Sequence, residues 1–234
     1  MIGEAAAATA VAGAAALGYA IRGRSSHLFG PSIWRGPGEG RLLALTFDDG
    51  PSEATLEVLE ILDRFAVRAT FFQCGSNIAR LPHITRQVHQ AGHELGNHTW
   101  SHPHLPACSP ARIRREIADT QQAIGDAAGA GASLFRAPYG QRWFGLRPAL
   151  AGHDLTGVMW TVLGYDWEWT AEEITRHVVT HASPGGIVCL HDGDRTSARV
   201  DRGETLRALP ILLPRLQERG FSFVTAGDMV DRLH

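Results

Sequence analysis

Apolar residues follow two different spacings along this chain. Short, continuous apolar runs are typical of strands that are covered on both faces. Such runs occur at 42–47, 69–73, 94–97, 133–136, 157–161, 186–190 and 221–224. Between them lie segments whose apolar residues recur every three or four positions, which is typical of amphipathic helices. Strands that alternate with helices predict a parallel sheet with right-handed crossovers, and at this length a small or incomplete (β/α) barrel.

The helices between these strands are predicted from periodicity and from their end signals. In 53–65, for example, Leu56, Leu59, Leu62 and Phe65 recur on one face. Ser109 is a candidate N-cap, and Pro110 suits the first helical position. The full set of predicted helices is 53–65, 82–91, 109–127, 146–151, 171–181, 204–219 and one that starts at 226.

The first 40 residues differ in composition from the rest of the chain. Residues 1–24 are rich in alanine and favour a helix. Three interpretations are open for this segment: an uncleaved membrane anchor, an atypical export signal, or a plain N-terminal helix. Residues 25–40 are rich in Gly, Pro and Ser, and they are predicted to form a linker that wraps onto the domain, held by Trp34.

Composition narrows the class of protein. A chain of 234 residues with 44% hydrophobic and 20% charged residues suits a single globular α/β domain. The net charge of -2 and the lack of a basic run give no indication of a nucleic-acid partner. Three cysteines without a CxxC spacing predict neither a disulfide framework nor a thiolate zinc site. Two of them, Cys74 and Cys189, lie in apolar runs and are expected in the core.

Two carboxylates follow the first predicted strand. Asp48 and Asp49 stand at its carboxyl end, where α/β folds place their chemistry. Neighbouring strand residues point to opposite faces, so we expect different roles for the two unless the strand end is twisted or bulged. One is expected to hold a metal and the other to move a proton. The alternative is a simple turn at Gly50 followed by a helix cap.

Two histidines follow the strand at 94–97. His98 and His102 are one helical turn apart, so both imidazoles can reach one ion. With Asp48 or Asp49 as a third ligand, they would form a catalytic metal arrangement with open positions. Zn²⁺ fits these donors best, and Co²⁺, Ni²⁺ or Fe²⁺ bind similar sites.

Further polar residues stand at three later strand ends. They are Arg136 in the segment FRAPYG, Asp166 in the segment YDW, and His191 at the end of the run IVCLH. An arginine can hold a carboxylate, and a backbone N–H after Pro138 can face an oxyanion. Each signal is weak alone, because each residue also suits an ordinary turn. Five strand ends that carry Asp-Asp, HxxxH, Arg, Asp and His together predict one active site.

Taken together, TFDDGP, HTWSH, FRAPYG, DW and LHD resemble the motifs of polysaccharide deacetylases of the NodB-homology type, carbohydrate esterase family four. The resemblance covers residues 41–234, which are expected to be the catalytic domain. It implies a distorted (β/α) barrel with about seven parallel strands. It also implies a divalent metal, usually zinc, and hydrolysis that removes acetyl groups from N-acetylated or O-acetylated sugars.

The resemblance implies a role for each residue on the metal side of the site. Asp48 corresponds to the general base, and Asp49 to the metal ligand beside His98 and His102. Arg136 would orient Asp48.

On the leaving-group side, the resemblance implies that His191 is the general acid and that Asp166 tunes it. Trp167 would line the pocket, and the backbone N–H of Tyr139 would join the oxyanion hole. Cys189 departs from the pattern, because the family usually has an aliphatic residue there.

Other functions remain open from the sequence. One alternative is an amidohydrolase acting on a small non-sugar amide, or an O-acetyl esterase. Another is an inactive carbohydrate-binding protein, although binding alone would not require Asp48, Arg136, Asp166 and His191. The partner is expected to be an N-acetylated glycan. The place of action depends on residues 1–24: a membrane-anchored or exported protein would act at the cell envelope, and otherwise the protein would be cytoplasmic. No oligomeric state is indicated.

Overall fold

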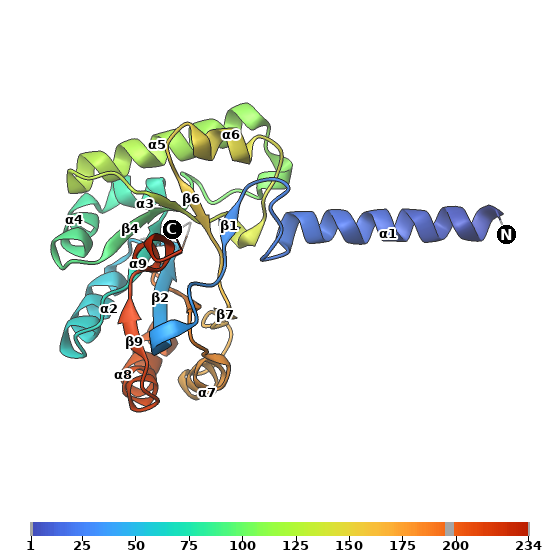
Figure 1. The fold of residues 1–234 in the computed structure, drawn as a ribbon. Coiled ribbons are helices and arrows are strands. Elements are labelled where there is room, and N and C mark those ends of the chain that lie inside the picture. The colour runs from blue at the N-terminus through green and yellow to red at the C-terminus, as the bar shows by residue number, and fades with distance from the viewer. Residues whose placement is uncertain (1, 195–198, 234) are drawn as a thin grey trace.

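The computed structural model describes residues 2–194 and 199–233, and within them nine strands form one sheet surrounded by helices (Figure 1). The strands are β1 (Ser32–Ile33), β2 (Leu42–Asp48), β3 (Thr70–Gln73), β4 (Glu94–Asn97), β5 (Leu134–Phe135), β6 (Thr156–Val158), β7 (Val162–Leu163), β8 (Gly186–His191) and β9 (Ser222–Val224). The α-helices are α1 (Ile2–Arg22), α2 (Glu53–Arg64), α3 (Gly75–Arg80), α4 (Pro82–Gln90), α5 (Pro110–Ala128), α6 (Leu146–Ala151), α7 (Ala171–His181), α8 (Gly203–Glu218) and α9 (Ala226–Asp231). Short 3-10 helices are η1 (Glu39–Arg41), η2 (Leu105–Ala107) and η3 (Pro138–Gly140).

The sheet is parallel and is organised around β2. Its order is β1-β6-β5-β4-β3-β2-β8-β7, and β9 also pairs with β2. One edge of β2 pairs with β8. The other edge is shared: its first half pairs with β9 and its second half with β3. The strands curl without closing, since no pairing joins β1 to β7 within the described ranges. The predicted distorted (β/α) barrel is therefore confirmed.

All seven predicted strands and all seven predicted helices are present, with ends shifted by at most three residues. The prediction missed α3 and the two-residue strands β1 and β7. Two residues are too few to show a periodicity, which explains why the sheet has nine strands where seven were expected.

Alternation along each strand separates two layers of side chains. On β2, Leu43, Leu45 and Phe47 point outward into the core shared with α2, α7 and α8. Ala44 belongs to a second cluster, which α9 closes through Met229. Polar residues occupy the inward positions nearer the carboxyl end of the strand, so the interior changes from apolar to polar along β2.

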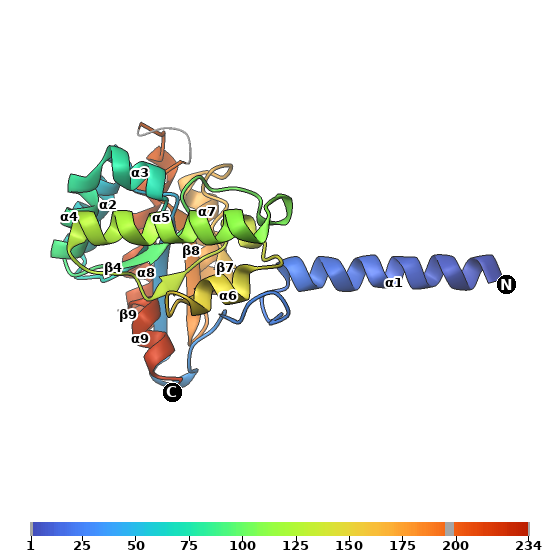
Figure 2. The same ribbon diagram turned by 90° about the horizontal axis from the view of Figure 1, so that it is seen from above.

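The N-terminal helix α1 projects away from the body (Figures 1 and 2). Residues 9–19 are exposed along it. In the part of the chain that the structure describes, no helix combines the length and apolar character needed to cross a bilayer.

Residues 25–40 lie against the body. Strand β1 pairs with β6, and Phe29 is buried against Trp143 and Phe144. The guanidinium of Arg142 donates to the carbonyls of Gly23 and Ser26 and to Ser32 Oγ. Trp34 is half-buried, and the guanidinium groups of Arg24 and Arg35 lie 5.7 and 5.4 Å from its ring centroid.

Candidate active site

A pocket of about 550 Å³ opens at the carboxyl ends of the central strands. Its wall includes seven of the nine predicted site residues, which come from separate strand ends. The lining residues are Asp48, Asp49, His98, His102, Tyr139, Trp160, Leu163, Trp167, Cys189, His191, Asp194 and Arg202. Of the predicted set, Arg136 and Asp166 lie behind this wall and contact the lining residues Asp48 and His191.

The backbone at Asp49 explains how two successive carboxylates reach one pocket. Asp48 is the last residue of β2, and Asp49 has a φ of 72°, in the left-handed region. This departure from extended backbone turns the Asp49 side chain to the same side as Asp48. The strand end is therefore distorted, which is the condition under which both carboxylates can serve one site.

Asp49, His98 and His102 form a compact cluster of metal-binding groups. Asp49 Oδ1 lies 3.4 Å from His98 Nε2 and 3.1 Å from His102 Nε2. His98 Nδ1 lies 2.7 Å from the carbonyl oxygen of Arg136, and donation to this oxygen leaves the Nε2 lone pair for an ion. Asp49 Oδ1 is buried and accepts no hydrogen bond from any described residue. The donor set fits a divalent metal.

The electrostatics of this cluster also suit a metal. Burial alone would raise the pKa of Asp49, but its interactions with His98 and His102 outweigh burial and hold that pKa well below its ordinary value. Burial lowers the pKa of His102 to about 4, against the opposing charge of Asp49. Near neutral pH, the cluster therefore offers a carboxylate and a neutral imidazole, which are the forms that bind metals.

Asp48 is held by a buried arginine. Arg136 Nη1 donates to Asp48 Oδ1 at 2.6 Å and lies 2.7 Å from Thr46 Oγ1. The guanidinium is fully buried, 4.1 Å from the ring centroid of Phe72. Oδ1 is thus occupied by the ion pair, and Oδ2 faces His98 Nε2 at 3.9 Å. Because the pair is buried, loss of the arginine would leave an uncompensated charge in the interior.

Cys189 contacts the same carboxylate. Its register partner on β2 is Thr46, and its thiol donates to Asp48 Oδ2 over 3.4 Å. Burial, together with the charge of Asp48, raises the pKa of this thiol well above its ordinary value, so it stays protonated and remains a donor. The expectation that Cys189 is a core residue is correct for its burial, and the structure adds a polar contact.

His191 is the neighbour of Asp48 across the sheet, and both residues line the pocket. Parallel register pairs Asp48 on β2 with His191 on β8. His191 Nδ1 lies 2.8 Å from Asp166 Oδ1, and Asp166 Oδ2 accepts from the His191 backbone N–H and from Thr205 Oγ1. Burial lowers the pKa of His191, but the charge and hydrogen bond of Asp166, together with the charges of Asp49 and Asp48, raise it to about 9. His191 is therefore protonated at neutral pH, with Nδ1 held by Asp166.

Two aromatic side chains frame the pocket. The ring of Trp167 is 52% exposed and lies perpendicular to the His191 imidazole, with centroids 5.0 Å apart. Tyr139 has a φ of 56° after Pro138, and its ring stacks on His104 at 4.0 Å. That ring also packs against His102 at 4.5 Å. His104 was not predicted to contribute here.

Several contacts were missed from the sequence. Thr46 is two positions before Asp48, and the period of two in a strand could have placed it on the same face. No sequence signal pointed to Thr205 or His104. Trp143 and Phe144 pack on Phe29 and do not line the pocket.

Comparison with known proteins agrees with the motifs and the fold. A family model described as polysaccharide deacetylase matches residues 35–158. A chitooligosaccharide deacetylase from Bradyrhizobium sp. (strain ANU 289) is 38% identical over 194 residues, which cover 77% of this chain and 87% of that protein. A peptidoglycan-N-acetylglucosamine deacetylase from Bacillus cereus is 33% identical over 205 residues, covering 86% and 93%.

A solved structure gives the same result in three dimensions. The crystal structure of a peptidoglycan N-acetylglucosamine deacetylase with a bound N-hydroxybenzamide derivative superposes with a TM-score of 0.79 and 31% identity. The match covers 84% of this chain and 91% of that one. The fold and pocket define a hydrolase built on a parallel (β/α) barrel. The chain belongs to the polysaccharide deacetylase family.

Proposed function

We propose that this protein is a metal-dependent N-deacetylase that hydrolyses the acetamido group of N-acetylated sugars in a glycan and releases acetate. The observation that best supports this proposal is that Asp48 on β2 and His191 on β8 are partners in the register of the two parallel strands. This pair supports a carboxylate and a protonated imidazole on neighbouring strands in one pocket, which the cluster of Asp49, His98 and His102 shares. Amide hydrolysis needs both a base for water and an acid for the leaving amine.

The proposed metal ligands are Asp49, His98 and His102. Two histidine nitrogens and one carboxylate, with positions left open, are typical of catalytic zinc sites. We therefore propose Zn²⁺, while Co²⁺, Ni²⁺ and Fe²⁺ suit similar donors. When bound, such an ion supplies Lewis acidity to the acetyl carbonyl and lowers the pKa of water.

Asp48 is the proposed general base. Arg136 occupies Oδ1, so the base is proposed to be Oδ2, which accepts from the Cys189 thiol and keeps a second lone pair for a proton of the attacking water. Water oxygen then bonds to the acetyl carbon, and the carbonyl oxygen becomes an oxyanion. The Tyr139 backbone N–H is proposed to donate to that oxyanion.

His191 is the proposed general acid. Asp166 holds Nδ1, which leaves Nε2 to deliver a proton to the amide nitrogen as the C–N bond breaks. The products are acetate and a free amino sugar. Trp167 is proposed to shield the imidazole and to line the site for the sugar.

Residues 41–234 are proposed as the catalytic domain, with residues 25–40 wrapped onto it. Relatives named for peptidoglycan and for chitooligosaccharides support a glycan substrate, and the former support action at the cell envelope. Attachment to a membrane surface through residues 1–24 belongs to the same proposal.

Two substitutions distinguish the proposed role of the base from that of the metal ligands. Asp48→Asn is expected to retain bound metal after dialysis but to lower kcat by about 10²- to 10⁴-fold. His98→Ala is expected to lose both the metal and the turnover. Metal content by elemental analysis and acetate release by a coupled assay measure the two properties separately. A near-normal rate for Asp48→Asn contradicts the base assignment.

A further inference from the structure

A second groove lies directly beside the catalytic pocket. It has a volume of about 390 Å³. The groove and the catalytic pocket share three lining residues, which are Tyr139, Trp160 and Leu163. The two are therefore adjacent. The far side of the groove is formed by Arg22 at the end of α1, by Arg24 just after it, and by His177 and His181 of α7.

The charge of this groove is unlike that of the catalytic pocket. The catalytic pocket is lined by three aspartates, whereas the lining of the second groove contains no carboxylate. Arg22 is exposed in the last turn of α1, and its side chain has no ion pair or hydrogen bond with any described residue. Arg24 is held in place because its Nη1 donates to the Thr161 carbonyl at 2.6 Å. The groove thus presents two cations whose charge no neighbouring carboxylate offsets.

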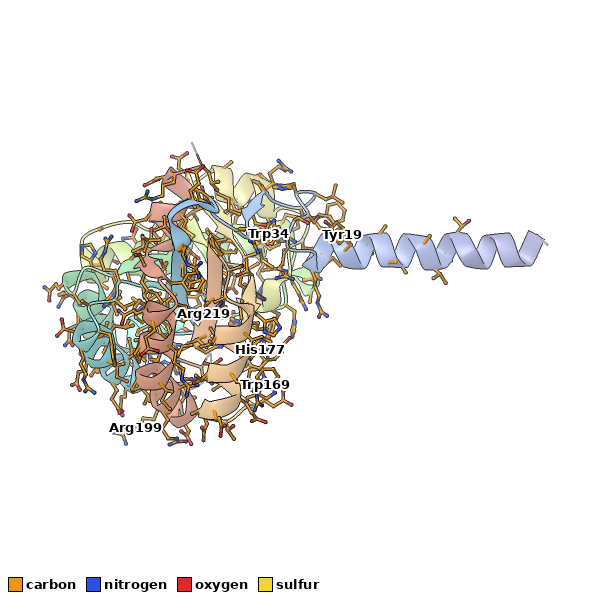
Figure 3. The ribbon with its side chains drawn as sticks, turned by 60° about the horizontal axis from the view of Figure 1, so that its bottom comes forward. Tyr19, Trp34, Trp169, His177, Arg199 and Arg219 are labelled. Carbon is orange, nitrogen blue, oxygen red and sulfur yellow. The ribbon has the colours of Figure 1, made fainter. Side chains whose placement is uncertain are left out.

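Aromatic rings extend from the catalytic acid into this groove. Trp167, beside His191, lies 5.6 Å from the ring of Tyr165, which is 36% exposed and lines the groove. Tyr165 in turn contacts Trp169 and His177, whose positions along the α7 side of the molecule are labelled in Figure 3. Burial and the neighbouring His181 lower the pKa of His177, so the proposed charge contacts of this groove are the two arginines.

We propose that this groove binds a second sugar of the substrate strand, next to the one that is deacetylated, through a carboxylate on that sugar. The inference rests on the proposed deacetylase function and specifies its substrate as an acidic glycan. The aromatic rings suit the sugar face, and the arginines suit the carboxylate, which guanidinium groups bind with two parallel hydrogen bonds. Tyr139 lines both the catalytic pocket and the groove, so the two binding places adjoin at this residue.

The expected preference for an acidic strand is modest, because the arginines are exposed to solvent. A solvent-exposed ion pair changes an affinity by roughly 1.4- to 5-fold, so two arginines correspond to about a tenfold preference in kcat/KM. The preference should shrink as salt is added, because these charges are exposed.

The test compares substrates that differ in charge alone. Peptide-free glycan strands of N-acetylglucosamine and N-acetylmuramic acid carry a carboxylate on every second sugar, and methyl esterification removes that charge. Acetate release at one pH gives kcat/KM on the acid strand and on its ester. The wild-type ratio is expected to be about ten, and Arg22→Gln and Arg24→Gln are each expected to reduce it by about threefold.

Arg35→Gln is the matched control. Arg35 stacks on the same Trp34 ring as Arg24, but it binds Ser183 and Pro184 and does not line the groove. The Arg35→Gln substitution should leave the ratio of kcat/KM between the acid strand and its ester unchanged. Since Arg24→Gln also removes a backbone contact, Arg22→Glu provides a second variant on a fully surface position, and it should reduce the ratio further than Arg22→Gln.

The possible results of these assays distinguish the groove assignment from the proposed deacetylase function. A wild-type ratio near one, or an Arg22→Glu variant with the wild-type ratio, overturns the groove assignment while leaving deacetylation intact. No acetate from any strand instead overturns the proposed function. Binding to phosphatidylglycerol vesicles that Arg22→Glu abolishes, with the ratio unchanged, would assign the arginines to a membrane surface and also overturn the inference.

Discussion

Asp166 controls the charge of His191, which is the residue expected to protonate the leaving amine. With His191 at a pKa of about 9, kcat/KM should stay high through neutral pH and fall as pH rises through that value. Asp166→Asn removes the charge that raises this pKa, and burial then lowers it. The alkaline fall in kcat/KM should therefore move to lower pH, as measured in a pH–rate profile.

Glu168→Gln is the matched control for this experiment. Glu168 is exposed two residues after Asp166 and has no ion pair within the described ranges. Its removal changes the net charge equally and should leave the alkaline limb in place. An Asp166→Asn enzyme with the wild-type limb would contradict the role of Asp166.

For single residues, the sequence predicted which residue types stand at the strand ends. It did not predict the contacts that their side chains make. Asp48, His98 and His191 were predicted to lie together because parallel strands bring their carboxyl ends together, and all three line one pocket. The turn of Asp49 into the same pocket depends on a positive φ at one residue. The contact of Cys189 with Asp48 depends on the register of β8 against β2. Neither property has a local sequence signal.

At the scale of elements, the segment that carries β1 is held by a buried aromatic ring. Phe29 is 6% exposed and packs on Phe144 and Trp143 with centroids 4.7 and 5.2 Å away. Phe29→Ala should lower the free energy of unfolding by about 3 kcal/mol. Chemical denaturation measures this value.

The adjacent Leu28 gives the control, since it is 67% exposed. Leu28→Ala should change the free energy of unfolding by less than about 0.5 kcal/mol. Equal effects of the two substitutions would show that residues 25–40 do not stabilise the body.

Elements with a clear period or a cap were predictable, whereas of the short elements β5 and α6 were predicted and α3, β1 and β7 were missed. Helix α5 begins at Pro110 with Ser109 as its N-cap, as the sequence indicated. Helix α3 has six residues and no side-chain cap, and β1 lies in a segment whose Gly and Pro content favours loops. Pairing with β6 is a tertiary effect that a local pattern does not contain.

At the scale of the whole molecule, one topology explains the location of the chemistry. All strand pairs are parallel, so the ends of β2, β4 and β8 deliver Asp48, the segment of His98 and His102, and His191 to one side of the sheet. Helix α9 closes the other end of the interior with apolar contacts. The pocket opens at the polar end of the described strands.

The most direct test of the account is acetate release from N-acetylglucosamine oligomers and from peptidoglycan, before and after metal chelation and after zinc is restored. We expect release that stops when the metal is removed and returns with zinc. Unchanged release from protein shown by elemental analysis to be free of metal would contradict the account. Absence of release from metal-loaded protein on both substrates would contradict the proposed sugar N-deacetylase.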